Sequence, residues 1–425
     1  MPETGRPTEA EILTPEPQPP ASAPSERVLW TMLLALTATF GLSQAYRTVA
    51  AIMGPPLQHG FDLSPQQLGS FAAIFHFAFG GLQLLMGIGV DTVGVRRTVL
   101  MAFPLTIAGA LLSCFAPGFG WLLLGQALIG IGCAPAFLAC TVFIARRYPA
   151  ERFAAVSGNV LAIGGIGMLM TGTPLAWLIE TTSWRVGFAV LAGLSALAWL
   201  AVLRRVHEPA GASPGRMTGE TLASALHGFA RLFTLPHTWS ILALGAVSYA
   251  AFVSLRGLWL GPVLVERHGF SLVAAGHVAF VTTLVALAGT VIFGRLDPGP
   301  ALRRRRIVAC ALLYAGCFAL MAANLGPVTD IAAAHVLSLL GGFIVLQYSD
   351  VHASYPPELT GRALSLFTMS MFLGVALMQW LTGATASFAA RAGWPVYDTV
   401  FVTITVMVLA GTAAFRWLPQ PRQMK

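Results

Sequence analysis

The chain has 425 residues, of which 56% are hydrophobic and only 10% are charged. Soluble domains carry about 25% charged residues, so this composition excludes a soluble globular protein and indicates an integral membrane protein. The net charge of +8 is distributed over short polar stretches between apolar segments, which indicates membrane topology and not a nucleic-acid-binding surface.

Twelve apolar segments are long enough to cross a bilayer, since a helix needs roughly 20 residues to span it. They divide six and six around a polar stretch, which predicts an all-α membrane protein with twelve transmembrane helices in two six-helix bundles. In chain order the predicted spans cover about residues 28–57, 67–90, 98–116, 120–145, 153–179, 185–203, 238–265, 272–294, 307–325, 328–352, 361–389 and 394–417.

The polar segments define the predicted domain boundaries. Residues 1–26 are rich in proline and glutamate and lack an apolar stretch, so we expect a disordered cytoplasmic tail and not a cleavable signal peptide. We expect the first bundle over 27–203, a cytoplasmic linker over 204–237, the second bundle over 238–418 and a short cytoplasmic tail over 419–425.

The basic residues are unevenly distributed between the two sides of the membrane that these spans define. Of the 25 basic residues, 20 lie on the side of the N-terminus, three (Arg185, Arg267 and Arg391) lie on the opposite side, and two lie within spans. The positive-inside rule then places both termini in the cytoplasm. We expect a multi-pass, monomeric protein of the cell inner (plasma) membrane, with the lipid bilayer and not nucleic acid as its surroundings.

The two halves of the chain repeat at an offset of 206 to 210 residues. Each half carries an arginine inside an apolar span, followed by Gly-Pro and then by His-Gly-Phe. The corresponding pairs are Arg47 with Arg256, Gly54 with Gly261, His59 with His268, Asp91 with Asp297, Tyr148 with Tyr355, and Trp184 with Trp394. Parallel halves of this kind place a substrate site near the membrane midplane, between the halves.

The repeated arginines, Arg47 and Arg256, are the leading candidates for that site. A charged residue at membrane depth is costly and usually faces a partner or a watery cavity. The seventeen acidic residues all lie in tails, loops or span ends, so no span carries a mid-membrane carboxylate. Since a guanidinium binds carboxylate or phosphate through two parallel hydrogen bonds, the pair predicts one central site for a small anionic substrate. The alternative is that each arginine snorkels or binds backbone carbonyls at a helix bend.

Four further polar residues inside spans are candidate substrate ligands. Gln44 and Tyr249 lie within two helical turns of the two arginines and can share their helix face. His76 can titrate near neutral pH and relay protons, and Gln347 adds an amide. For each of them the alternative is a hydrogen bond that holds neighbouring helices together.

No enzyme chemistry is expected from the chain. The five cysteines lie in apolar spans without metal-site spacing, and no segment assembles a nucleophile with a base. A phosphate-binding glycine-rich loop with lysine is absent, so an ATP-driven pump is not expected. We therefore predict no catalytic residue, no metal and no cofactor.

The loop after the second span carries a sequence signature. It reads Gly87-Ile-Gly-Val-Asp91-Thr-Val-Gly94-Val-Arg96-Arg97, and a weaker copy occurs at 294–297 and 303–306, after the eighth span. With twelve spans and the half-repeat, the chain resembles the major facilitator superfamily, whose pattern is G-x-x-x-D-x-x-G-x-[RK]-[RK]. The resemblance implies the major facilitator fold, in which two pseudo-symmetric six-helix bundles enclose a central cavity.

The same loop is expected to gate the cytoplasmic side. A short turn with glycine lets the carboxylate of Asp91 meet an adjacent helix end or a cytoplasmic arginine in one state. Two residues depart from the family pattern: Thr92 replaces a basic residue, and Gln126 replaces an arginine linked to proton coupling, which argues against coupling through the fourth span. Gating roles are assigned to Gly87, Asp91, Gly94, Arg96, Arg97 and Asp297, with topology alone as the alternative for the arginines.

The leading functional hypothesis is a secondary active transporter, symporter or antiporter, that moves a small organic anion by alternating access. The placement of the two arginines resembles transporters for organic phosphates and related organic anions, which hold the substrate between one arginine from each half. The proton is a candidate coupling ion. The alternative is an efflux transporter for hydrophobic compounds, in which the arginines are structural, and a third hypothesis is a membrane sensor that does not transport.

Overall fold

The computed structural model describes residues 25–207 and 229–420, which form helices joined by short turns. The first half contains nine helices among the described residues. Their bounds are α1 (Glu26–Phe61), α2 (Pro65–Gly81), α3 (Gln83–Thr92), α4 (Val95–Cys114), α5 (Phe119–Cys133), α6 (Ala136–Arg147), α7 (Ala150–Met170), α8 (Thr173–Thr181) and α9 (Trp184–Arg205).

The second half begins with one long helical run, Pro236–Arg267, that changes its winding three times. The run consists of α11 (Pro236–Ser254), the π-helical η1 (Leu255–Trp259), α12 (Leu260–Pro262) and the π-helical η2 (Val263–Arg267). It is followed by α13 (Leu272–Arg295), α14 (Pro300–Ala322), α15 (Pro327–Leu340), the short 3-10 helix η3 (Gly341–Phe343), α16 (Ile344–Ser354), α17 (Pro357–Ala392) and α18 (Val396–Trp417).

Eleven helices in the described ranges are long and apolar enough to cross a membrane. The pair α2 and α3 supplies a twelfth, because its two parts pass the same test together although they are bent by 42°. The predicted all-α architecture with twelve spans is therefore confirmed. The predicted linker over 204–237 falls largely on residues 208–228, which lie outside the described ranges, as do most of both tails.

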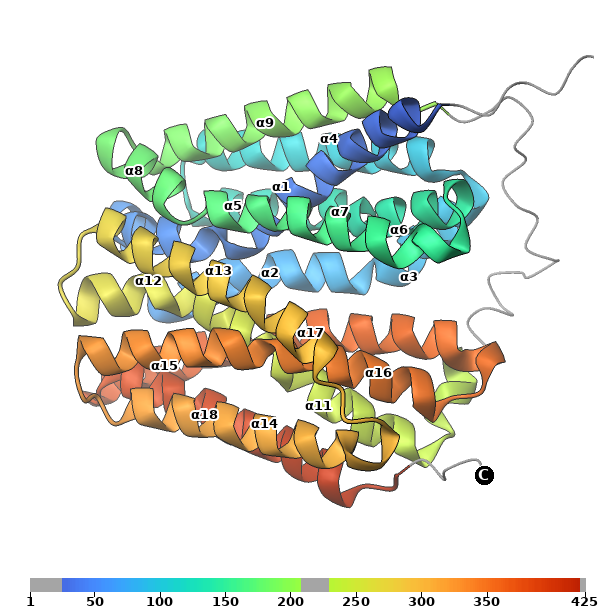
Figure 1. Cartoon of the computed structure of the whole chain (residues 1–425). Coiled ribbons are helices and arrows are strands. Elements are labelled where there is room, and N and C mark those ends of the chain that lie inside the picture. The colour runs from blue at the N-terminus through green and yellow to red at the C-terminus, as the bar shows by residue number, and fades with distance from the viewer. Residues whose placement is uncertain (1–24, 208–228, 421–425) are drawn as a thin grey trace, which may run out of the picture.

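The helices of the two halves form two groups that meet along a seam (Figure 1). The described chain begins and ends at the same end of the molecule, on the right in Figure 1, which we call the terminal end; the opposite end is the far end. The main contacts across the seam are those of α1 with the Pro236–Arg267 helix, of α2 with α17, and of α7 and α8 with α13. The seam is the place where a site shared by both halves must lie.

Helix ends follow from local sequence. The turn between α1 and α2 ends at Ser64, whose hydroxyl accepts a hydrogen bond from the Gln67 amide while the Gln67 side chain bonds back, a capping box that starts α2. Gly94 joins α3 to α4 with φ of 99°, a left-handed conformation that glycine adopts without strain. The signature glycine is thus required by the turn between two spans.

Glycines bring the two halves into backbone contact along the seam. A Cβ atom built on Gly261 would stand 1.6 Å from the Ala51 carbonyl oxygen, one on Gly69 would stand 2.5 Å from that of Gln379, and one on Gly172 would stand 3.0 Å from that of Gly276. Real Cβ atoms essentially never stand closer than 3.0 Å to other atoms, so Gly261 and Gly69 have no room for a side chain, and Gly172 is at that limit. Since these contacts lie toward the far end of the helices, the structure is closed there by direct helix packing.

Candidate functional site

Arg47 lies on α1 and is only 6% exposed, although it carries a full charge. Its Nη1 donates to Gln44 Oε1 at 2.7 Å and its Nη2 to Ser43 Oγ at 3.4 Å, both on the same helix. The guanidinium carbon stands 4.5 Å from the ring centroid of Phe79 on α2 and 4.7 Å from that of Phe372 on α17. Two aromatic faces offset part of the cost of burying the charge, by about 1–2 kcal/mol each.

Arg256 lies in η1 and is fully buried, with 0% exposure. Its Nε donates to Thr283 Oγ1 on α13 at 2.9 Å, and its Nη2 donates to the Met168 carbonyl oxygen on α7 at 3.1 Å. Met168 lies in the last turn of α7, where the free carbonyls carry partial negative charge. Nη1 has no hydrogen-bond partner among the described residues, so the charge is only partly compensated.

The two arginines have pseudo-equivalent surroundings. Arg47 contacts α2 of its own half and α17 of the other half, whereas Arg256 contacts α13 of its own half and α7 of the other. The two backbones lie at one level, because a Cβ on Gly257 would stand 2.9 Å from the Arg47 carbonyl oxygen. The two guanidinium groups, however, contact different pairs of helices on the two sides of this crossing. In this conformation they do not meet at a common point.

Neither arginine forms an ion pair with a carboxylate of the described residues. Instead, each guanidinium is covered in part by a group from the opposing half: Phe372 covers Arg47, and the Met168 carbonyl covers Arg256. Burying an arginine without a counter-charge costs several kcal/mol. The arrangement can therefore accept an anion as soon as the covering groups move away.

Tyr249 is linked to the Arg47 environment through Phe372, and Gln347 is linked to Ser248, the residue before Tyr249. The Tyr249 ring meets the Phe372 ring edge-on, with centroids 5.6 Å apart, and Phe372 is one of the two rings that cover Arg47. Ser248 donates to Gln347 Oε1 at 3.0 Å, and Gln347 Nε2 has no partner among the described residues. A cavity of about 80 Å³ is lined by Ser248, Tyr249 and residues of α13, α15 and α16. This volume holds a few water molecules.

His76 lies on α2 and is 1% exposed. Its Nδ1 bonds the Ala72 carbonyl oxygen, one turn earlier on the same helix, at 3.1 Å. This is not the hydrogen bond between helices that was the alternative for this residue, and Nε2 has no partner among the described residues. Two glutamines show the same deficit: both polar side-chain atoms of Gln379 on α17, and Nε2 of Gln126 on α5, are buried without partners. The sequence analysis did not select Gln379 as a candidate substrate ligand, although it has the same feature that selected Gln347, an amide side chain inside a predicted span.

The segment around Arg256 departs from the half-repeat. Arg47 and Gly54 lie in one regular α-helix, whereas Arg256 lies in a π-helical segment and a second π-helical segment follows Pro262. π-helical turns are rare and often occur at functional sites. The repeated Gly-Pro motif did not predict this difference in helix type, because the same two residues occur in the α-helix of the first half and beside the π-helical segments of the second.

Five of the six predicted gating residues lie at the terminal end around the turn between α3 and α4: Gly87 and Asp91 in α3, Gly94 in the turn, and Arg96 and Arg97 at the start of α4. Gly94 forms the turn, Arg96 Nη2 donates to the Leu203 carbonyl oxygen on α9 at 3.0 Å, and Arg97 is exposed. The side chain of Asp91 lies outside what the structure describes. The gating roles of this turn, including Gly87, therefore stay a prediction.

Asp297, the counterpart of Asp91, is held within its own turn. Its carboxylate accepts hydrogen bonds from Arg303 Nε at 3.0 Å and Nη2 at 2.7 Å and from the Gly299 amide at 3.0 Å. The Arg303 guanidinium is the main reason why the pKa of Asp297 lies below its ordinary value. Arg303 also donates to the Ser349 carbonyl oxygen, so this group ties α14 to α16 at the terminal end.

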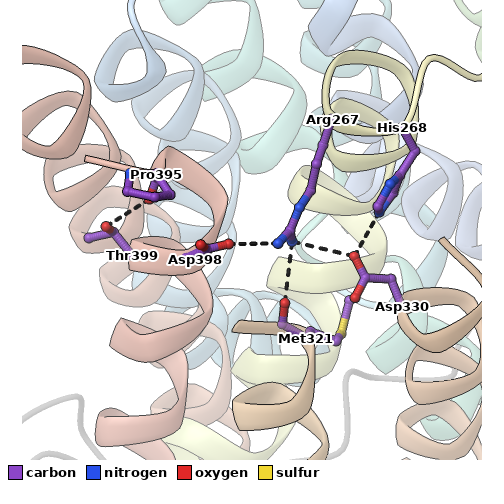
Figure 2. Close-up of polar contacts among 7 residues, drawn as sticks. All are labelled: Arg267, His268, Met321, Asp330, Pro395, Asp398 and Thr399. Carbon is purple, nitrogen blue, oxygen red and sulfur yellow. Dashed lines mark hydrogen bonds and ion pairs between the residues drawn. The ribbon is translucent and has the colours of Figure 1, made fainter. Parts of the chain in front are cut away.

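A charged cluster closes the far end of the second half (Figure 2). Arg267 Nη2 donates to Asp398 Oδ1 at 2.6 Å, and its Nη1 donates to Asp330 Oδ2 at 3.4 Å and to the Met321 carbonyl oxygen at 3.3 Å. His268 Nε2 donates to the same Asp330 oxygen at 2.8 Å. The cluster joins the end of the Pro236–Arg267 helix to α14, α15 and α18, and thereby fixes the helix that carries Arg256.

We expect Asp330→Ala to destabilise the protein more than Asp398→Ala. The Asp330 side chain is 1% exposed and serves both Arg267 and His268, so its removal leaves buried donors unpaired and costs about 3 kcal/mol. The Asp398 side chain is 27% exposed and serves Arg267 alone, so its loss costs about 1 kcal/mol. Thermal unfolding of the purified variants, followed by tryptophan fluorescence, measures both. Equal losses of stability in the two variants would show that burial of the carboxylate does not determine how much it contributes to this cluster.

The chain is similar to a known protein family and to individual proteins of Escherichia coli. A family model described as Major Facilitator Superfamily matches residues 33–378. The fosmidomycin resistance protein of Escherichia coli (strain K12) is 24% identical over 371 residues, which cover 86% of this chain and 88% of that protein. The D-galactonate transporter of Escherichia coli O6:H1 (strain CFT073) is 22% identical over 394 residues, which cover 86% and 91%.

A solved structure has the same fold. The bacterial homologue of the human lysosomal transporter Spinster, in an inward-facing and occupied conformation, superposes with a TM-score of 0.68 at 18% identity. The likeness covers 92% of this chain and 97% of that chain. At this identity it concerns the fold alone.

Proposed function

Because the chain belongs to the major facilitator superfamily and is a multi-pass membrane transporter, not an enzyme, we propose that it carries a small organic anion by alternating access. The observation that supports this proposal is the pair of buried arginines, one in each half, without a carboxylate partner among the described residues. Two uncompensated cations at the seam favour an anionic ligand and oppose a cationic one.

Movement of the two halves apart would expose both arginines. Separation of α2 from α17 takes Phe372 away from Arg47, and separation of α7 from α13 takes the Met168 carbonyl away from Arg256. Each guanidinium then has donor groups free for a ligand in the space between the halves. An anion that binds both arginines replaces the lost contacts and favours closure of the two halves around it. The anion then binds the closed state more tightly than the open state, and alternating access requires such a difference in affinity.

The substrate class follows from guanidinium geometry. A carboxylate or phosphate takes two parallel hydrogen bonds from one arginine, and a second arginine can bind the same group or a second acidic group. Gln44 already bonds Arg47 and can orient it, while Tyr249 and Gln347 add polar contacts near Phe372. The D-galactonate transporter of Escherichia coli is named for a sugar carboxylate, which is consistent with this class.

Orientation, gating and coupling complete the proposal. The distribution of basic residues favours an inner membrane location with both termini in the cytoplasm. The turn with Gly87, Asp91 and Gly94 would close the cytoplasmic side in the opposite state. If a proton is coupled to transport, His76 is the candidate carrier, since it lies on α2 near the seam and its Nε2 lacks a partner.

A second candidate function is efflux of hydrophobic compounds. A groove of about 470 Å³ lies between α2 and α17, lined by apolar side chains that include Phe77, Leu377 and Trp380. It lies on the seam and is bounded by helices that must separate during transport. Such a groove can admit an apolar molecule from the bilayer, and this observation favours the alternative.

A ligand screen separates the two candidates. Purified protein is heated with single organic anions (sugar carboxylates, dicarboxylates and sugar phosphates) or with lipophilic dyes, and the unfolding midpoint is recorded. We expect an anion at about 100 times its Kd to stabilise the protein by about 2.7 kcal/mol. Neutral sugars of the same size serve as controls. Stabilisation by the dyes alone would contradict the anion proposal and support efflux of hydrophobic compounds.

A further inference from the structure

A second group of arginines lies far from the seam, at the terminal end of the second half. The first turns of α14 and the last turn of α18 enclose a cavity of about 390 Å³. Arg304 and Arg305 of α14 and Arg416 of α18 line it, and Val308 and Phe415 contribute apolar surface. The cavity therefore combines guanidinium groups with a hydrophobic wall.

The charge in this cavity is not balanced. Arg304 is paired, because its Nε donates to both oxygens of Asp350 at 3.1 Å and its guanidinium carbon lies 4.6 Å from the Phe415 ring centroid. Arg305 and Arg416 are exposed, and their side chains form no hydrogen bond or ion pair with the described part of the chain. The cavity thus presents two uncompensated positive charges.

The cavity lies at the depth of the lipid headgroups. α18 has 22 residues and is therefore about 33 Å long, close to the roughly 30 Å thickness of the hydrocarbon core. Arg416 is in its last turn, and the adjacent Trp417 is 80% exposed, as expected for an aromatic residue at the membrane interface. Leu312, two turns deeper along α14 than Arg305, is 50% exposed and offers an apolar surface to acyl chains.

From these observations we infer that the cavity between α14 and α18 binds the phosphate headgroup of an anionic phospholipid of the bilayer. The phosphate contacts Arg305 and Arg416, and the acyl chains lie along the apolar surface beside Val308 and Leu312, deeper in the membrane. Basic pockets between transmembrane helices at this level suit such headgroups. A bound lipid would join α14 to α18 without touching the seam, so this site is independent of the substrate proposed above.

The first half shows a contrast at the corresponding place. There Arg96 of α4 donates to the Leu203 carbonyl oxygen of α9, so a hydrogen bond joins the two helices, whereas α14 and α18 are joined by the stacking of Arg304 on Phe415. Arg204 and Arg205, in the last turn of α9, are exposed like Arg305 and Arg416. They provide a matched control for a double substitution of surface arginines at the terminal end.

The test uses delipidated full-length protein in detergent, with phosphatidylglycerol, phosphatidylcholine or inorganic phosphate added at equal concentration. We expect phosphatidylglycerol to raise the unfolding midpoint by several degrees more than phosphatidylcholine. Arg305→Gln/Arg416→Gln should remove at least half of that difference, and Arg204→Gln/Arg205→Gln should keep it.

Three results would overturn the proposal. Equal shifts with both lipids would show that headgroup charge is not recognised. The same shift with inorganic phosphate would indicate a site for a free anion and not for a lipid. A lipid difference that persists in Arg305→Gln/Arg416→Gln would place the lipid elsewhere. Both residues are exposed, so the variant is expected to fold, and Arg305→Gln alone should show an intermediate loss.

Discussion

Arg256→Gln is expected to lower transport by about 100-fold without lowering the thermal stability of the protein. Loss of one side of a desolvated, charge-assisted contact with the substrate costs 2–5 kcal/mol, and each 1.36 kcal/mol corresponds to a factor of ten. Stability should stay unchanged or rise, because the guanidinium is fully buried, lacks a carboxylate among the described residues and leaves Nη1 unpaired. A purely structural arginine would behave in the opposite way.

The same logic applies to Arg47. Arg47→Gln should also lower transport about 100-fold, and Arg47→Lys should restore part of it, because lysine keeps the charge but loses the two-pronged hydrogen bond. Arg27→Gln, at the exposed start of α1, is the control for the general effect of removing a positive charge. Substrate flux into proteoliposomes and the unfolding midpoint are measured on the same preparations. Normal flux in stable Arg47→Gln and Arg256→Gln variants would rule out the proposed site.

Gly261→Val is expected to prevent closure of the far end. The added Cβ would stand 1.6 Å from the Ala51 carbonyl oxygen, and a backbone atom cannot rotate away as a side chain can. α1 and the Pro236–Arg267 helix must then stay apart, and transport should fall at least about tenfold because one of the two end states is lost. Gly316→Val on α14 is the control, since a Cβ there meets nothing within 4 Å.

Labelling of a cysteine buried at the seam tests whether the far end stays open. Leu68 is fully buried, and its side chain lies 3.3 Å from the position of a Cβ on Gly54, where α1 and α2 meet near Pro262. We expect Leu68→Cys to resist a water-soluble maleimide in the parent protein and to react in the Gly261→Val background. If the cysteine stays protected and transport continues at the parental rate, the glycine contact is not needed for closure.

Hydropathy predicted the helices well because the bilayer imposes a minimum length on each span. The second predicted span, 67–90, is the instructive case, since the structure divides it into α2 and α3 with a bend of 42°. An apolar run specifies that a segment enters the membrane, but it does not specify whether the helix stays straight. The bend occurs at Leu82, and the next residue, Gln83, donates through its side chain to the carbonyl oxygen of Ala134, in the turn between α5 and α6.

The half-repeat identified the two arginines and correctly placed them in corresponding helices. It did not reveal that Arg256 lies in a π-helical segment, or that Phe372 and the Met168 carbonyl cover the two guanidinium groups. Those contacts join residues far apart in the chain. Local patterns contain no information about which distant residue covers a given side chain.

The far-end cluster was not predicted at all. In the sequence Arg267, Asp330 and Asp398 are separate charges at the ends of spans. Asp330 lies 63 residues after Arg267, and Asp398 lies 131 residues after it. Short-range spacing rules apply to residues that share one helix, and these residues lie on different helices. Only the packing of the helix ends brings the three side chains within hydrogen-bond distance.

The sequence by itself determined the membrane class, the number of spans, the repeat and the presence of two arginines without mid-span carboxylates. These properties depend on the composition of each segment and on the spacing of the repeat, because each span must by itself be long and apolar enough to cross the bilayer. Tertiary structure alone decided which groups cover Arg47 and Arg256, that the far end is closed at Gly261, and that Arg305 and Arg416 share a cavity. The reason is physical: burial and charge compensation depend on neighbours from other helices, and helix packing sets those neighbours.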